Sequence, residues 1–252
     1  MQGDRPYLSG LLGLALAGSI AGFSGCLSPG MMKFRGTTAA SFMRTIEESK
    51  DPNARYFAYD KLAASRTYEN DEQKTRAATL LTAKLKSGSE PIATRAIICR
   101  TLGMLGKPVA RQVILTATND EDPLVRAEAC RALGRVGRPE DGTILARIMI
   151  LDNGSIESRV AAVESLGDLK STDRRIYELL VQGMEDPQPA VRVACLKSLR
   201  AISGKDFGVD PLAWKKFVDD TNPKPATPAP PEPAIDPLPK LPDSVRELPE
   251  IR

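Results

Sequence analysis

Five arginines mark an internal repeat in this chain of 252 residues. They are Arg55, Arg95, Arg126, Arg159 and Arg192, at intervals of 40, 31, 33 and 33 residues. A leucine follows each arginine seven residues later, at Leu62, Leu102, Leu133, Leu166 and Leu199. A recurrence of this period is typical of a solenoid, in which each unit buries its apolar face against the next unit.

The residues around each arginine have the period of an α-helix. Positions three, four, seven and ten after the arginine are mostly apolar and lie on one helix face. Turn and capping residues precede each arginine: Asp51-Pro52, Ser89-Glu90-Pro91, Asp122-Pro123, Gly154-Ser155 and Asp186-Pro187. Further helices are predicted between them, at residues 72–86, 109–118, 143–151 and 174–184. The pattern predicts an all-α fold, an α-solenoid of about five stacked helix pairs over residues 41–203.

Small and sulfur-containing side chains also follow the repeat. A glycine lies eight residues after three of the arginines, at Gly103, Gly134 and Gly167, which suits a helix end or a tight contact between helices. Cys99, Cys130 and Cys195 fall on the buried stripe. Equivalent positions of packed helices are about 8 to 10 Å apart, too far for a disulfide, so these thiols are expected to stay unpaired.

Two segments resemble a known repeat family. Residues 122–137, DPLVRAEACRALGRVG, and 186–203, DPQPAVRVACLKSLRAIS, are similar to short HEAT-like repeats of the type also found in phycobilin lyases. The resemblance covers residues 51–203. It implies that the five arginines form a structural ladder, pair with the Asp at the helix start and hold the repeats in register. Residues 204–221 resemble a capping segment, with Trp214 and Phe217 expected to cover the last repeat; an aromatic binding pocket is the alternative.

The N-terminus has the composition of an export signal. Residues 1–25 contain a short apolar run, and Phe23-Ser24-Gly25-Cys26 resembles the lipobox of bacterial lipoproteins. We expect a signal peptide at 1–25, lipidation of Cys26 and a linker at 27–40. Ordinary cleavage beside Cys26 and an uncleaved anchor remain alternatives, and each of them still exports the chain.

The composition argues against most catalytic chemistry. The chain has no histidine, which removes histidine-based triads and histidine-ligated metals. The cysteines that follow Cys26 are odd in number and form no CxxC pair, so no metal site and no cofactor are expected. The formal net charge of +3 is too small for a general nucleic-acid coat, and no nucleic-acid partner is expected.

Exposed helix positions and the C-terminus offer candidate binding regions. Positions five, nine and twelve after the arginines predict a basic ridge, interrupted by Glu164 and Asp168, of Arg100, Lys107, Arg131, Arg135, Arg138 and Lys197. An acidic protein partner on this ridge is one hypothesis, and an ordinary solvated helix face is the other. Residues 222–252 contain ten of the 20 prolines and are predicted to be a disordered tail, either a spacer or a docking peptide.

These observations favour a non-catalytic protein–protein interaction scaffold. We expect it to be exported and lipid-anchored at the bacterial cell envelope, facing the periplasm or the extracytoplasmic side. One alternative is a lyase-like or enzyme-accessory protein that binds a chromophore or small ligand, as the resemblance permits. Another is a structural component of the cell envelope.

Overall fold

The computed structural model of the chain describes residues 38–152 and 154–221. The signal peptide, Cys26, most of the expected linker and the proline-rich tail therefore lie outside the described residues. The α-helices are α1 (Ala39–Glu48), α2 (Pro52–Lys61), α3 (Asp71–Ser87), α4 (Ile92–Leu105), α5 (Arg111–Ala117), α6 (Pro123–Val136), α7 (Gly142–Leu151), α8 (Ile156–Leu169), α9 (Arg174–Gly183), α10 (Pro189–Ser203) and α11 (Pro211–Thr221). Short 3-10 turns lie at η2 (Ser65–Thr67), η3 (Pro108–Ala110) and η4 (Pro139–Asp141). Within the described part every regular element is helical, which confirms the predicted all-α solenoid.

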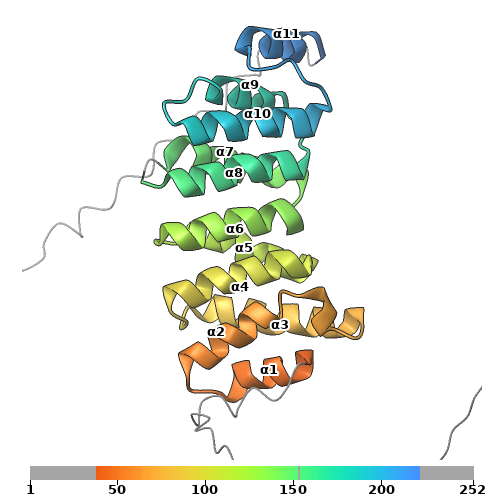
Figure 1. Cartoon of the computed structure of the whole chain (residues 1–252), viewed down its shortest axis with the longest axis vertical. Coiled ribbons are helices and arrows are strands. Elements are labelled where there is room, and N and C mark those ends of the chain that lie inside the picture. The colour runs from red at the N-terminus through yellow and green to blue at the C-terminus, as the bar shows by residue number, and fades with distance from the viewer. Residues whose placement is uncertain (1–37, 153, 222–252) are drawn as a thin grey trace, which may run out of the picture. The chain divides into compact units, whose positions relative to one another are not determined.

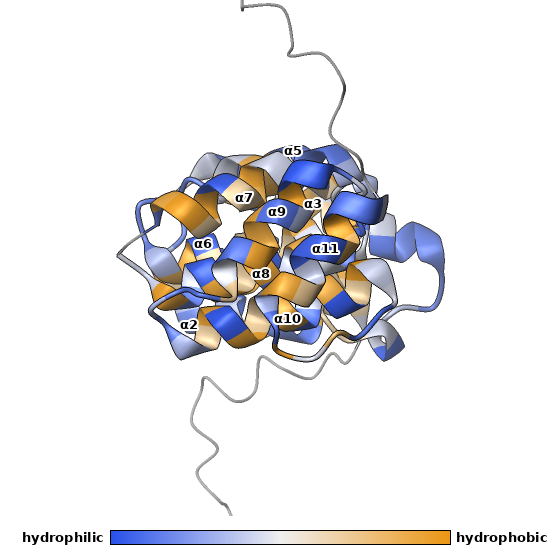
Figure 2. Ribbon diagram, turned by 90° about the horizontal axis from the view of Figure 1, so that it is seen from above, coloured by the Kyte–Doolittle hydropathy of each residue, from blue (hydrophilic) through white to orange (hydrophobic). Residues whose placement is uncertain are grey.

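The helices of the described part form two layers. The ladder helices α2, α4, α6, α8 and α10, which carry the five arginines, pack one on the next (Figure 1). Helices α3, α5, α7 and α9 lie in the second layer, each against the ladder helix that follows it. Seen from above, the ribbons alternate between hydrophilic and hydrophobic segments, as amphipathic helices do (Figure 2).

Capping residues start the helices, with two differences from the prediction. The carboxylates of Asp51 and Asp122 accept hydrogen bonds from the first turns of α2 and α6, as expected. Glu90 does not cap α4, because its carboxylate accepts from Arg55 and Tyr59 instead. Asp186 lies further out than predicted, since α10 begins at Pro189. The first helix, α1, begins at Ala39, inside the segment expected to be a linker.

The predicted apolar stripe is the core. The five leucines seven residues after the arginines are all fully buried, as the repeat predicts. At its two ends the stripe is less buried than predicted. Ser65 is exposed because α2 ends at Lys61, and Leu196 and Ile202 are half-buried because the described part of the chain has no further ladder helix over α10.

The glycines of the repeat lie at close contacts between ladder helices. A Cβ on Gly103 would lie 2.7 Å from the Cα of Ala132 in α6. A Cβ on Gly134 would lie 2.9 Å from the Cβ of Ser165 in α8, and one on Gly167 would lie 3.0 Å from the Oγ of Ser198 in α10. Of the two predicted roles, the tight helix contact is the one observed.

The C-terminal end of the described solenoid is covered by α11 and the segment before it. Trp214 is fully buried, and its ring centroid lies 5.0 Å from that of Phe207 and 6.2 Å from that of Phe217. The indole Nε1 donates a hydrogen bond to the carbonyl of Gly208 at 3.0 Å. The aromatic group is therefore part of the core, and Trp214 is not accessible as a binding pocket.

Candidate functional site

The arginine ladder, defined by Arg55, Arg95, Arg126, Arg159 and Arg192, joins consecutive repeats. Each of the first four arginines binds a carboxylate in the turn that precedes the next ladder helix. In Arg126, Nε and Nη2 lie 2.8 and 3.0 Å from the two carboxylate oxygens of Asp152, a two-point, charge-assisted contact. The other pairs are Arg55–Glu90, Arg95–Asp120 and Arg159–Asp186.

The same guanidinium groups also hold the turn before their own helix. Nη1 of Arg126 donates to the carbonyl of Asp120 at 3.0 Å, and Nη1 of Arg55 donates to the carbonyl of Ser49 at 3.0 Å. The expectation that each arginine pairs with the Asp at its own helix start is therefore wrong. Asp51 and Asp122 cap their own helices, and each of the first four arginines takes its partner carboxylate from the turn before the following ladder helix.

Burial and hydrogen bonding compete at the ladder carboxylates. Burial disfavours the ionised form of Asp120, but hydrogen bonds from Arg95 and from the backbone N–H of Asp122 outweigh it and lower the pKa of Asp120. The pKa of Glu90 is lowered in the same way, since Arg55 and the Tyr59 hydroxyl oppose the effect of burial. These carboxylates are therefore ionised at neutral pH and bind their arginines as anions.

Arg192 differs from the other ladder arginines. Its Nη1 donates to the carbonyls of Asp186 and Pro187, at 2.8 and 3.1 Å, so it holds its own turn in the usual way. No carboxylate of the described residues binds its guanidinium, because the described array has no repeat beyond α10.

The residues of the predicted basic ridge do not form one uniform patch. Lys107 forms an ion pair with Asp71, and Arg131 forms ion pairs with Glu128 and Glu157. These pairs offset two of the six predicted cations.

The other four cations are exposed. Arg100, Arg135, Arg138 and Lys197 are on or beside α4, α6 and α10, and Nη1 of Arg135 lies 2.9 Å from Sδ of Met104. Helix α8 lies between α6 and α10 and exposes Glu164 and Asp168. The outer side of the ladder helices is therefore mixed in charge.

A concave surface that the sequence did not predict lies on the second layer. Three adjoining hollows of about 470, 550 and 690 Å³ follow α7, α9 and α11, and Gln182 of α9 lines all three. We name this surface the α9 face; its apolar side chains include Met149, Ile150, Leu151, Leu179 and Leu212.

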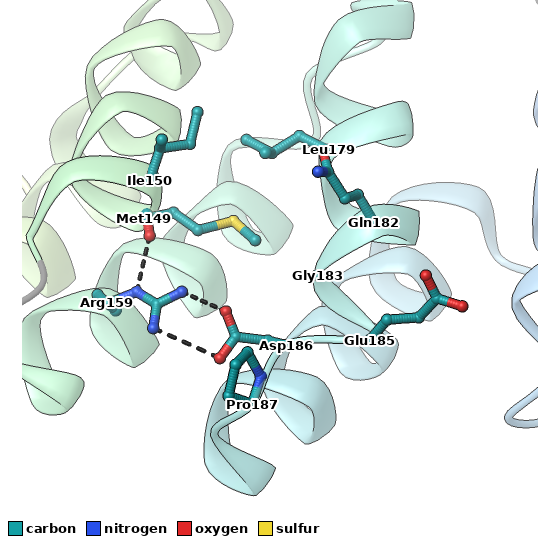
Figure 3. A pocket seen from close by; sticks show the side chains of 9 residues that line it. All are labelled: Met149, Ile150, Arg159, Leu179, Gln182, Gly183, Glu185, Asp186 and Pro187. Atoms are coloured by element: carbon teal, nitrogen blue, oxygen red, sulfur yellow. Dashed lines mark hydrogen bonds and ion pairs between the residues drawn. The ribbon is translucent and has the colours of Figure 1, made fainter.

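The first hollow shows how the α9 face is built. Ile150 and Leu179 lie on opposite walls, on α7 and α9, with Met149 beneath them (Figure 3). The Arg159–Asp186 ion pair closes the base, where Nε of Arg159 also donates to the carbonyl of Met149 at 2.8 Å (Figure 3). One ion pair of the arginine ladder thus forms the base of this hollow.

The exposed apolar residues of the α9 face have a weak signal in the sequence. Residues 148–151 read Ile-Met-Ile-Leu, a run that continues around the helix beyond the one face an amphipathic helix buries. Ile150 and Leu151 are 54% and 66% exposed, whereas Ile148 and Met149 are buried. An apolar run of this kind at the end of a helix indicates, from the sequence, a partly exposed apolar site.

The described residues contain neither a cluster suited to a metal ion nor a helix suited to a membrane span. No group of three or more Cys, Asp or Glu side chains in this part of the chain is placed to hold a metal ion. Among the helices described, none combines the length and hydropathy needed to cross a membrane.

Comparison with known proteins identifies the repeat. Residues 78–156 match the family model described as HEAT repeats, and residues 176–205 match the one described as HEAT repeat. A solved structure with a similar fold is the complex of CpcE and CpcF of phycocyanin lyase from Nostoc sp. PCC7120. The TM-score is 0.57 at 18% sequence identity, over 71% of this chain and 68% of the other. No curated protein has significant sequence similarity to the chain.

Proposed function

Because this chain is built of HEAT repeats, we propose that it is a non-catalytic scaffold that binds a protein partner through the α9 face. The observation that carries the proposal is the row of three adjoining hollows with exposed apolar side chains on α7, α9 and α11. Protein interfaces combine an apolar centre with a polar rim, and the α9 face has this arrangement.

The residues of the α9 face indicate the chemistry of the partner. Ile150 and Leu151 are more than half exposed, and burying one such side chain contributes about 1.5 to 3 kcal/mol. Charged groups of both signs lie around them, including Arg147, Arg175 and Glu178. A segment with apolar anchor residues flanked by both acidic and basic side chains fits this surface.

Crosslinking in intact cells that produce the protein tests the proposal. A photoreactive residue in place of Leu151 should give a defined crosslinked species, while the same residue in place of Thr79, exposed on α3, should not. Ile150→Glu should reduce the Leu151 crosslink at least tenfold, because it places a charge in the apolar centre. Leu124→Glu, at an exposed apolar position of α6 in the other layer, makes the same change of charge and should leave the crosslink unchanged. Equal crosslinking from both positions, or no effect of Ile150→Glu, would contradict the proposal.

The exposed cations of the ladder helices are proposed as a second, salt-sensitive contact for an acidic part of the partner. Arg100 and Arg135 are exposed on consecutive ladder helices, and exposed charges are screened beyond about 10 Å at 0.1 M salt. Replacing both with Ala should weaken capture of the crosslinked partner at low salt more than at high salt. Unchanged capture at every salt concentration would assign these residues to the solvated surface.

We further propose that the chain is exported and anchored by a lipid on Cys26. The support is the sequence of residues 1–26, and the expected anchor is stable because a diacylglyceryl group supplies two acyl chains. Metabolic labelling with a fatty acid should mark the wild type and not Cys26→Ser. Equal labelling of both chains would end the lipoprotein proposal.

A ligand-binding accessory role is the second candidate. It is supported by the fold shared with a phycocyanin lyase complex and by hollows whose volumes fall within the range of about 300 to 1,000 Å³ of small-molecule sites. Absorbance of the full chain purified from its own cells separates the two roles. Visible absorption that Ile150→Glu removes would favour the accessory role over the scaffold.

A further inference from the structure

The C-terminal end of the arginine ladder has the chemistry of a carboxylate-binding site. Four ladder arginines each bind a carboxylate 25 to 35 residues further along the chain. Arg192 makes the same bonds to its own turn, but no described residue supplies its carboxylate. The repeat therefore presents one guanidinium that has no carboxylate partner among the described residues.

The groups around α10 exclude a second copy stacked end to end. Where α4, α6 and α8 have a glycine against the next helix, α10 has Arg200, which is bonded to Asp206. At the other end, α2 has Lys61 at the position of Ala132 and Ser165, the small residues that fit against those glycines. Two cationic side chains would lie where the array otherwise packs a glycine against a small residue, so another ladder helix cannot continue the layer with the same packing.

Exposed apolar side chains lie near the end of α10 that carries Arg192. Arg174, at the start of α9, pairs with Asp219 near the end of α11, while Leu212 lines a hollow with Glu185 of the α9–α10 turn. Helix α11 is therefore antiparallel to α9, and Leu212 lies toward the turn that leads to Arg192. Leu212 is 74% exposed and Val193 is 53% exposed.

The C-terminal part of the sequence repeats the residue pattern of the turn whose Asp binds Arg159 of the ladder. Asp186-Pro187-Gln188-Pro189-Ala190-Val191 and Asp236-Pro237-Leu238-Pro239-Lys240-Leu241 share the pattern Asp-Pro-x-Pro-x-aliphatic. In the first copy, Asp186 binds Arg159, Pro189 starts α10 and Val191 is buried. The second copy has Pro242 where the first has Arg192, and a proline at this position disfavours continuation as a ladder helix.

We propose that residues 236–241 dock on the end of α10, with the Asp236 carboxylate on the guanidinium of Arg192. Asp236 would thus bind Arg192 as Asp186 binds Arg159, and Leu238 and Leu241 would cover the exposed apolar side chains. Residues 222–235 can extend to about 43 Å at about 3.1 Å per residue, whereas α11, which they must pass, is about 16 Å long. A linker of this kind gives an effective concentration of about millimolar, so a weak contact is populated.

Distances between two spin labels in the full chain test the docking. Labels are placed at Lys197→Cys, exposed on α10, and at Ala234→Cys in the tail, in a Cys26→Ser chain whose other cysteines are buried. Pulsed electron paramagnetic resonance should show a narrow short-distance population. Asp236→Asn, which leaves every described residue unchanged, should reduce the ratio of docked to free tail about tenfold.

Matched variants and dilution give the deciding comparisons. Glu232→Gln removes a neighbouring tail carboxylate and should leave the short distance in place. A single broad distribution in the wild type, or equal loss with Asp236→Asn and Glu232→Gln, would overturn the proposal. Disappearance of the short distance when unlabelled chain is added would overturn it too, because the tail would then belong to a second copy. The α9 face shares Leu212 with this contact, so the measurements are made on the purified full chain without any partner, and their outcomes do not depend on the scaffold role.

Discussion

Substitution of the three contact glycines by alanine tests why the ladder helices pack as they do. Two effects oppose each other at Gly103, Gly134 and Gly167. Alanine favours a helix over glycine by up to about 1 kcal/mol, whereas an added atom in a closely packed contact costs about 1 to 3 kcal/mol. The distances decide which effect is larger at each position.

The structure ranks the three substitutions. At Gly103 the new Cβ would meet the backbone Cα of Ala132 at 2.7 Å, which side-chain rotation cannot relieve. At Gly134 the nearest atom is the Cβ of Ser165 at 2.9 Å, and at Gly167 it is the Oγ of Ser198 at 3.0 Å. We expect Gly103→Ala to lower the free energy of unfolding by about 2 kcal/mol, Gly134→Ala by less, and Gly167→Ala to be close to neutral.

Equilibrium urea denaturation of the full chain measures these differences. Far-UV circular dichroism reports all helices, and the fluorescence of Trp214 reports the C-terminal end, so separate transitions would reveal repeats that unfold independently. Ala83→Gly, at an exposed interior position of α3, measures helix propensity alone and should cost about 1 kcal/mol. If all three alanine variants are more stable than the wild type, or their order is reversed, the close-contact explanation is refuted.

Three further predictions concern the core, the ladder and the thiols. Leu133→Ala should lower the free energy of unfolding by about 2 to 5 kcal/mol in the same urea assay, whereas Leu124→Ala on the exposed side of α6 should cost less than about 1 kcal/mol. The lowered pKa of Asp120 in the folded state means that its contribution is present above the ordinary pKa of an Asp and is lost as pH falls toward the folded value. Asp120→Asn should therefore reduce the stability difference between pH 7 and pH 3, and an unchanged difference would contradict the ion-pair argument. Burial raises the pKa of Cys130 to about 12, so a thiol reagent should label it rapidly after denaturation and slowly before; fast native labelling would contradict its core position.

Helix periodicity explains how much of this fold the sequence predicts. The spacing of Leu102, Leu133 and Leu166 requires each helix to bury one stripe, and a repeated stripe requires neighbours, so the solenoid follows from local pattern alone. The positions of Gly103, Gly134 and Gly167 further indicated that neighbouring ladder helices pack closely. Capping was predicted less well, because Glu90 and Asp186 form ion pairs with distant arginines, and this use competes with capping.

The sequence alone determined the helices, their pairing and the stripe that each one buries, because these depend on residues a few positions apart. Only the tertiary structure decided which carboxylate binds each ladder arginine, that Arg192 binds none of the described ones, and where the hollows of the α9 face lie. Those features depend on the lengths of turns and on the distances between stacked helices. Arg159 and Asp186 are 27 residues apart in sequence and meet only because α8 and α10 pack together.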